Sequence, residues 1–112
     1  MEQDKGESIL IGWTTVSNEE DALRLINKLL TAGLIACAQI SQPIKSFYVW
    51  KGEIKNESEI RITLKFSPTK EAELGKELIK LHPYDTPQWV YTEVNADSEY
   101  AKWVDETKSS AL

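Results

Sequence analysis

The chain has 112 residues, of which 41% are hydrophobic and 28% are charged, and its formal net charge is −5. These values are typical of one globular domain and exclude a wholly disordered chain. The negative charge argues against nucleic acid and anionic membranes as partners, because both attract basic surfaces. The sequence has no apolar run of the roughly 18 residues that a membrane-spanning helix needs. Its single cysteine, Cys37, excludes an intramolecular disulfide.

The beginning of the chain predicts a tail, a strand and the start of a helix. Residues 1–8 are polar and are expected to form a flexible tail before a single domain over residues 9–112. They lack the apolar stretch of a signal peptide, so the cytoplasm is the expected compartment. A first strand is predicted over residues 9–13, and Ser17 with Glu20 forms a capping box at the start of a helix.

The next segment predicts the end of that helix and the first arm of a long hairpin. Gly33 is typical of a helix end, and from Leu34 to Ile40 the apolar period is two. Pro43 is expected to bend or interrupt this strand. The strand resumes over residues 47–50, and residues 51–53 predict a tight turn.

The second arm of the hairpin has the clearest alternation in the chain. One face is apolar and consists of Ile60, Ile62, Leu64 and Phe66. The other face is polar and consists of Glu59, Arg61, Thr63 and Lys65. This pattern predicts a strand with one face against the core.

The last third of the chain predicts a helix, a strand and a short terminal helix. Ser67-Pro68 is typical of a helix start, with the serine as cap and the proline in the first turn. The segment His82-Pro83-Tyr84-Asp85-Thr86-Pro87 ends this helix, because residues before proline avoid helical angles. A strand is predicted over residues 88–94, and Asp97 caps the last helix.

The element order β-α-β-β-α-β with an extra C-terminal helix predicts an α+β fold of the ferredoxin-like, or split βαβ, type. Helices on one face of a four-stranded sheet leave the other face uncovered. Exposed sheet edges and the aromatic side chains Phe47, Tyr48 and Trp50 are a liability for a monomer. Self-association is therefore expected.

His82 is the only histidine and the first candidate for a metal ligand, since imidazole binds transition metals readily. The alternative is a structural histidine at the end of its helix. Cys37 is either a small buried hydrophobe, or a thiol that faces a cleft or binds a soft metal. An enzyme that uses Cys37 with His82 as its base is the last-ranked hypothesis.

A second group of residues predicts a ligand cleft. Glu59 could hold a cation or an amine and Lys65 an anion, although both residues could equally form ion pairs between subunits. Tyr48, Trp50 and Tyr84 are amphipathic aromatics that suit either an interface or a ligand platform.

Several motifs together resemble the CutA family of divalent-cation-tolerance proteins. They are Ala36-Cys37-Ala38, Tyr48-Val49-Trp50-Lys51-Gly52-Glu53-Ile54, Leu64-Lys65, the segment from His82 to Pro87, and Tyr100-Ala101-Lys102-Trp103. The resemblance implies a ferredoxin-like subunit in a homotrimer related to the PII signalling proteins, with the long hairpins packed on neighbouring subunits. It also implies a role in tolerance of copper and other divalent metals, with no obligatory cofactor and no enzymatic reaction.

Two residues depart from the copper-binding pattern of some relatives. Trp13 stands where those relatives have a cysteine in the first strand, and Leu81 stands where they have the first histidine of a pair. His82 is then the one predicted metal ligand of that set. The leading hypothesis is a trimeric protein of metal homeostasis, and the alternative is a PII-like sensor with a small molecule in the cleft between subunits.

Overall fold

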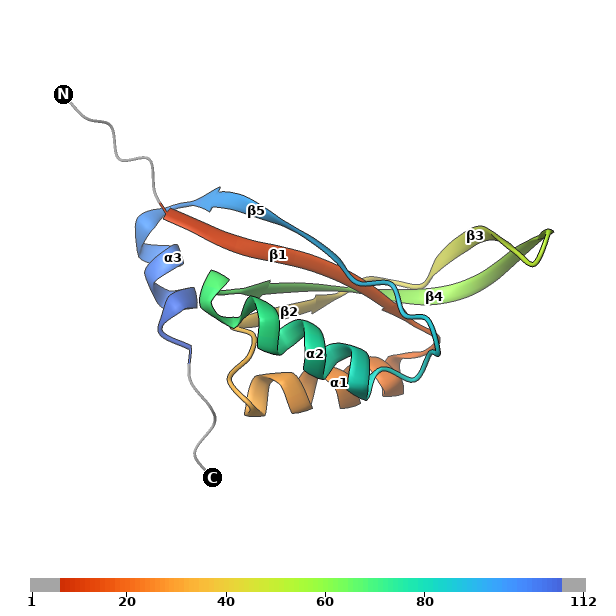
Figure 1. Cartoon of the computed structure of the whole chain (residues 1–112), viewed down its shortest axis with the longest axis horizontal. Helices are drawn as coiled ribbons and strands as arrows, with labels where there is room; N and C mark the ends of the chain where they lie inside the picture. Colours follow the sequence, from red (N-terminus) through yellow and green to blue (C-terminus); the bar gives the residue numbers. More distant parts are fainter. Residues whose placement is uncertain (1–6, 108–112) are drawn as a thin grey trace.

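The computed structural model describes residues 7–107 and contains one antiparallel sheet and three α-helices (Figure 1). The elements are β1 (Glu7–Val16), α1 (Glu19–Thr31), β2 (Cys37–Ile40), β3 (Ile44–Trp50), β4 (Glu53–Phe66), η1 (Pro68–Lys70), α2 (Glu71–Leu81), β5 (Val90–Ala96) and α3 (Ser98–Asp105). The predicted α+β class and the order of the elements are confirmed. Within residues 7–107, every helix is too short or too polar to span a bilayer.

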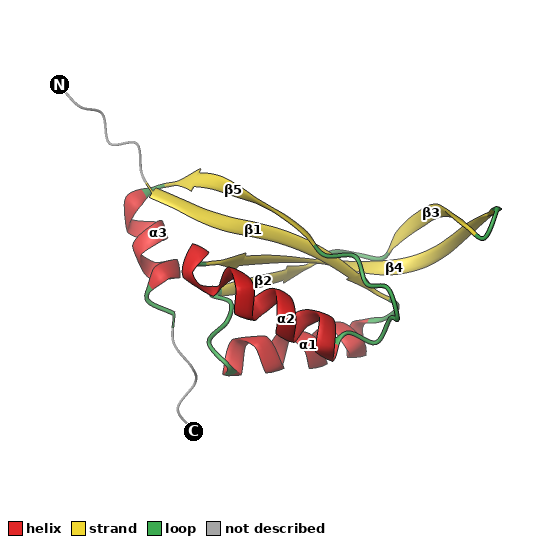
Figure 2. Cartoon of the chain, viewed as in Figure 1, coloured by secondary structure: helices red, strands yellow, loops and turns green. Residues whose placement is uncertain are grey.

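The strand order is β2-β4-β1-β5, and all neighbouring strands are antiparallel. The strand β4 therefore lies between the two strands of the first β-α-β unit, β1 and β2, and β1 lies between the two strands of the second unit, β4 and β5. The predicted second strand is interrupted at residues 41–43, so β2 and β3 pair with different parts of β4. Beyond this break β3 and β4 continue as a two-stranded hairpin that projects from the body (Figure 2). Lys51 and Gly52 both have positive φ, which gives the two-residue turn that such a hairpin favours.

The main core lies between the sheet and the layer formed by α1 and α2. The predicted apolar face of β4 is confirmed, because Ile60, Ile62, Leu64 and Phe66 are all buried. From β1 the same core takes Leu10 and Val16. Figure 1 shows both helices on one side of the sheet.

The opposite face of the sheet is less open than the sequence predicts. Ile9 belongs to a second, smaller cluster with Ala101 and Val104 of α3, whereas its neighbour Leu10 belongs to the main core. Adjacent residues of a strand point to opposite faces. It follows that α3 packs on the face away from α1 and α2 and covers one end of it.

Several predicted boundaries shift. β1 begins at Glu7 instead of residue 9, so Glu7 and Ser8 belong to the sheet and not to the predicted tail. Residues 1–6 of that tail, and residues 108–112 of the predicted domain, lie outside the described residues. The expected cap Ser17 is replaced by Asn18, whose side chain accepts a hydrogen bond from the backbone N–H of Asp21.

The other predicted helix boundaries are confirmed, except that the predicted second helix opens with a 3-10 turn, η1, and α2 itself begins at Glu71. Gly33, the second residue after the end of α1, has a positive φ. Ser67 caps η1 with Pro68 in its first turn, and Asp97 accepts hydrogen bonds from two backbone N–H groups at the start of α3. The helix α2 ends at Leu81, immediately before the segment 82–87.

Candidate functional site

The segment from His82 to Pro87 crosses the end of β1, where His82 is only 7% exposed. The backbone N–H of Tyr84 donates to Nδ1 of His82 at 3.1 Å. Because Nδ1 accepts, the proton of the neutral ring is on Nε2. Nε2 lies 3.0 Å from the carbonyl oxygen of Thr15, to which it donates, and 3.0 Å from Oγ1 of Thr14.

Both ring nitrogens of His82 are therefore occupied by hydrogen bonds within the chain. Burial lowers the pKa of His82 from 6.5, against the opposing effects of the Thr15 carbonyl, Asp21 and Glu59. A metal ion at this imidazole would have to displace one of these hydrogen bonds. Within residues 7–107, His, Cys, Asp and Glu side chains nowhere gather in a group of three that could hold a metal ion.

Tyr84 extends the network to the root of the hairpin. Its hydroxyl donates to Oε2 of Glu59 at 2.8 Å and lies 3.0 Å from the hydroxyl of Ser17. Burial, with a further contribution from Glu59, raises the pKa of Tyr84 to about 12. Its ring lies 4.9 Å from the His82 ring, between centroids. The network explains why Ser17 is not the helix cap, because its hydroxyl is in contact with a tyrosine 67 positions away.

Glu59 does not lie open on the sheet as the sequence predicts, because it is 9% exposed beside Tyr84. Next to it on the same face of β4 is Glu57, which accepts a hydrogen bond from the hydroxyl of Tyr48. That bond raises the pKa of Tyr48 above its ordinary value. Glu57 was not predicted from the sequence, although the turn at residues 51–52 fixes a register that makes Tyr48 and Glu57 diagonal neighbours.

The predicted cleft residues fall into two groups within one chain. Glu59 and Tyr84 lie at the root of the hairpin, where Ile44 pairs with Glu59, and Tyr48 lies about midway along it. Trp50 lies on the Tyr48 face of β3 beside the turn and is 51% exposed. Cys37 and Lys65 are cross-strand partners at the other end of β4. Lys65 is six residues from Glu59, which is roughly 20 Å along a strand.

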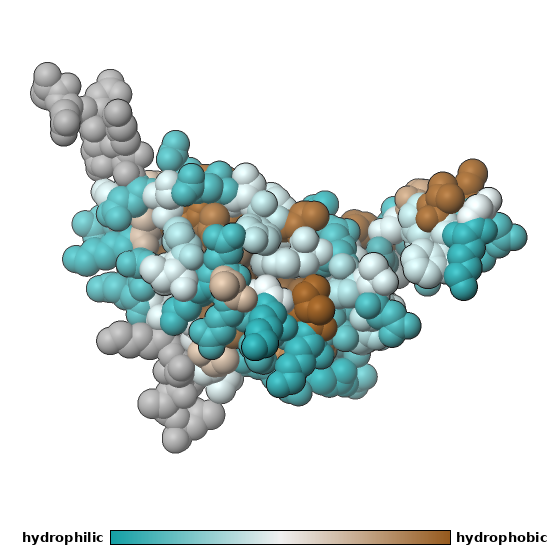
Figure 3. Space-filling view, in the orientation of Figure 1, coloured by the Kyte–Doolittle hydropathy of each residue, from teal (hydrophilic) through white to brown (hydrophobic). Residues whose placement is uncertain are grey.

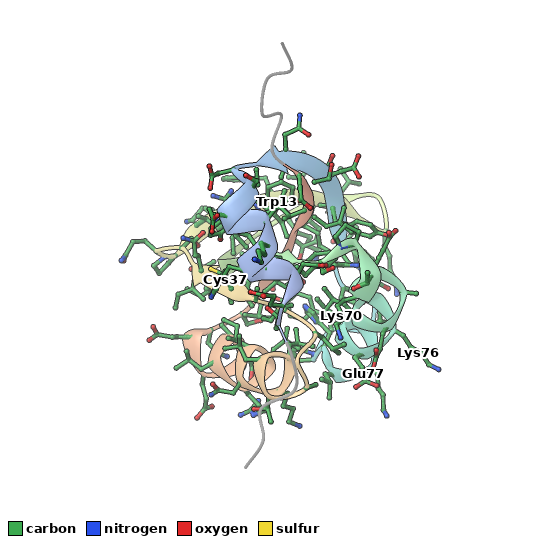
Figure 4. All side chains as sticks on the ribbon, turned by 90° about the vertical axis from the view of Figure 1, so that its left-hand side faces the viewer. Trp13, Cys37, Lys70, Lys76 and Glu77 are labelled. Atoms are coloured by element: carbon green, nitrogen blue, oxygen red, sulfur yellow. The ribbon has the colours of Figure 1, made fainter. Side chains whose placement is uncertain are left out.

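The second group belongs to the surroundings of α3. The ammonium of Lys65 lies 5.8 Å from the centroid of the Tyr100 ring, a cation–π contact. Cys37 is partly buried, and its neighbour Ala36 packs against the α3 cluster. Figure 4, which views the molecule from the α3 end, shows Cys37 in the sheet layer, away from Lys76 of α2. Cys37 makes no hydrogen bond with His82, whose partners are Thr14, Thr15 and Tyr84.

These features define a small α+β protein with a split β-α-β sheet, a projecting hairpin and a tyrosine–carboxylate network at the root of that hairpin. Residues 10–107 match the model of a family described as CutA1 divalent ion tolerance protein. The chain belongs to this family, as its sequence motifs predict.

Individual relatives cover nearly the whole chain. The divalent-cation tolerance protein CutA of Thermotoga maritima is 42% identical over 100 residues, which is 88% of this chain and 98% of that protein. The crystal structure of the divalent ion tolerance protein CutA1 from Ehrlichia chaffeensis has a TM-score of 0.82 at 38% identity, over 91% of this chain and 94% of the other. The Archaeoglobus fulgidus structure, described as a periplasmic divalent cation tolerance protein CutA, has a TM-score of 0.83 at 32% identity, over 88% and 96%.

Proposed function

We propose that the chain acts in tolerance to divalent cations as a homotrimer that binds copper or another divalent ion between its subunits. The family membership supports the metal role. The main support for a homotrimer is the apolar surface of the projecting hairpin. The role is one of binding, and no reaction is assigned to it.

One face of the hairpin is apolar and has no core beneath it. Val49 and Ile54 are cross-strand partners, and Phe47 lies on the same face. They are 69%, 81% and 68% exposed, respectively. Figure 3 shows this apolar surface at the end of the hairpin, far from the body. Contiguous exposed apolar side chains are typical of a protein–protein contact.

Two free sheet edges support the same assembly. Among residues 7–107, β3 pairs only with β4 and β5 pairs only with β1, and each of these strands has seven residues. Unpaired strand edges favour pairing with another chain. A contact between two different edges of successive copies is heterologous, and such contacts close into a ring when the rotation allows it.

Light scattering after size-exclusion chromatography tests the assembly. The wild-type chain is expected to have three times the mass of a subunit, and Phe47→Glu with Ile54→Lys is expected to give smaller species. Leu23→Glu is the matched control, because Leu23 is a 48% exposed apolar residue on α1, outside the hairpin. A wild-type monomer, or a trimer unaffected by the hairpin changes, would refute the proposed assembly.

The copper site is tested by titration of the purified protein with Cu²⁺. His82 stays the predicted ligand, and copper would have to displace the Tyr84 N–H or the Thr15 carbonyl from its ring. The proposal expects His82→Ala to lose copper uptake while Cys37→Ser retains it. Equal uptake by wild-type and His82→Ala protein of unchanged secondary structure would rule out a specific site at His82.

A second candidate function is a sensor with a small molecule in the cleft between subunits. The network of Tyr48, Glu57, Glu59 and Tyr84 favours it, because it gathers polar and aromatic groups on the hairpin face opposite Phe47, Val49 and Ile54. Thermal shift in the presence of small metabolites is the test, and the absence of any stabilisation would count against it.

The cytoplasmic location stays a prediction, with the periplasm of the Archaeoglobus description as the alternative.

A further inference from the structure

The projecting hairpin joins the body of the molecule through a narrow connection. In the body, β4 lies between β1 and β2, and its pairing with β1 ends at Ile60. From Glu59 to the turn, β4 pairs with β3 alone among residues 7–107. A two-stranded hairpin without further support is only marginally stable in water. Side-chain contacts at this connection therefore determine how firmly the hairpin is held.

Tyr84 makes such a contact. Its hydroxyl donates a hydrogen bond to Oε2 of Glu59, the first hairpin residue of β4, and lies 3.0 Å from the hydroxyl of Ser17 in the body. Glu59 is buried, so water competes little for this bond. The backbone N–H of Tyr84 donates to His82, whose ring is hydrogen-bonded to Thr15 of β1. Tyr84 thus links the hairpin to two places in the body.

The other tyrosine–carboxylate hydrogen bonds of the described residues do not cross this connection. Tyr48 donates to Glu57 within the hairpin. Tyr91 of β5 donates to Glu71 of α2 at 2.8 Å, within the body. The three bonds have the same chemistry and differ in the parts of the fold that they join, so they provide matched controls for one another.

We propose that the segment 82–87 is a strap that holds the hairpin in place for a second copy of the chain, with Tyr84 as its contact residue. Glu59 lies on the hairpin face opposite to the apolar face. The strap therefore holds the hairpin from one side and leaves the apolar side open to the second copy. A hairpin that is already ordered loses less conformational entropy when it associates. The proposal rests on the proposed assembly and makes that assembly depend on a residue outside the apolar face.

Amide hydrogen exchange measured by mass spectrometry tests the strap. It is followed in the wild-type chain and in Phe47→Glu with Ile54→Lys, the variant in which a second copy should not protect the hairpin. In both backgrounds, Tyr84→Phe should raise the exchange of the hairpin amides about tenfold, because a hydrogen bond to a charged group is lost. Tyr91→Phe removes the same kind of bond within the body and should leave hairpin exchange unchanged. Without the hairpin changes, Tyr84→Phe should also raise the subunit concentration at which the trimer dissociates.

Glu59→Gln is the second variant should Tyr84→Phe fail to fold, because an amide oxygen still accepts the hydrogen bond but carries no charge. It should raise hairpin exchange by less than Tyr84→Phe. Equal hairpin exchange in Tyr84→Phe and Tyr91→Phe, or an increase spread evenly over the chain, would overturn the strap. Faster hairpin exchange in Tyr84→Phe with unchanged association would overturn its role in assembly. A wild-type monomer would refute the proposed assembly, and the exchange comparison would then test the strap by itself.

Discussion

Gly12 is the point where β1 meets an aromatic cluster, and alanine there should destabilise the protein. A Cβ at Gly12 would lie 2.5 Å from Cη2 and 2.8 Å from Cζ3 of Trp89, and 3.1 Å from Cβ of Tyr91. The Trp89 ring cannot move away freely, because its centroid is 5.8 Å from that of Phe66 and 5.4 Å from that of Tyr91. Close approach of a side chain explains the glycine in mid-strand.

The size of the effect follows from two opposing contributions. Overpacking a well-packed site costs about 1–3 kcal/mol. Replacing a glycine inside a strand gains about 0.5–1 kcal/mol of conformational entropy. We expect Gly12→Ala to lower the free energy of unfolding by about 0.5–2 kcal/mol, the difference between the cost and the gain.

Gly75 provides the matched control on the other side of the same ring. A Cβ there would lie 3.6 Å from Nε1 of Trp89, which is ordinary van der Waals contact. Gly75 is inside α2, so alanine should stabilise by about 0.5–1 kcal/mol. Denaturant unfolding at equal subunit concentration measures both variants. Unchanged stability of Gly12→Ala, or an equal loss in Gly75→Ala, would refute this account of Trp89 packing.

Three further predictions concern the network and the start of α1. Asn18→Ala should lower the free energy of unfolding by about 1 kcal/mol, because it removes the helix cap. Ser17→Ala should act only through its contact with Tyr84. If denaturant unfolding shows a larger loss for Ser17→Ala than for Asn18→Ala, Ser17 is the cap after all. The pKa of His82 is lowered by burial, so stability should fall as the pH decreases below 6.5, and His82→Asn should flatten the pH dependence of unfolding measured from pH 7 to 4. The pKa of Tyr84 is raised to about 12, so its contribution to the stability of the fold is complete below pH 10.0 and is lost as the pH rises through 12. Ultraviolet titration should show one tyrosine that ionises at higher pH than the others, and Tyr84→Phe should remove this step.

The sequence predicts local structure well where a single pattern decides it. The alternation through Ile60 to Phe66, the glycine after α1 and the cap at Asp97 all depend on residues close together in the chain. Ser17 and Asn18 are equally good caps by residue type. The choice is made by Tyr84, whose contact with Ser17 no local pattern shows.

Only part of the candidate site was predicted from the sequence, because three-dimensional packing decides the rest. Period-two patterning places Glu59 and Lys65 on one face, but a face of a 14-residue strand is long enough to hold two separate sites. Lys65 falls beside Tyr100 because α3 packs on that face, and an amphipathic helix alone does not show which side of a sheet it covers.

The hydrogen bonds of the segment 82–87 connect parts of the fold that a ligand at the hairpin would affect. His82 holds the segment to the end of β1, and Tyr84 joins Glu59 of β4 to Ser17 at the start of α1. Since Glu59 and Ser17 both hydrogen-bond to the Tyr84 hydroxyl, a change at Glu59 reaches the start of α1 through one side chain. The segment 82–87 is thus placed to couple a change at the hairpin to the body of the chain, with His82 as its anchor.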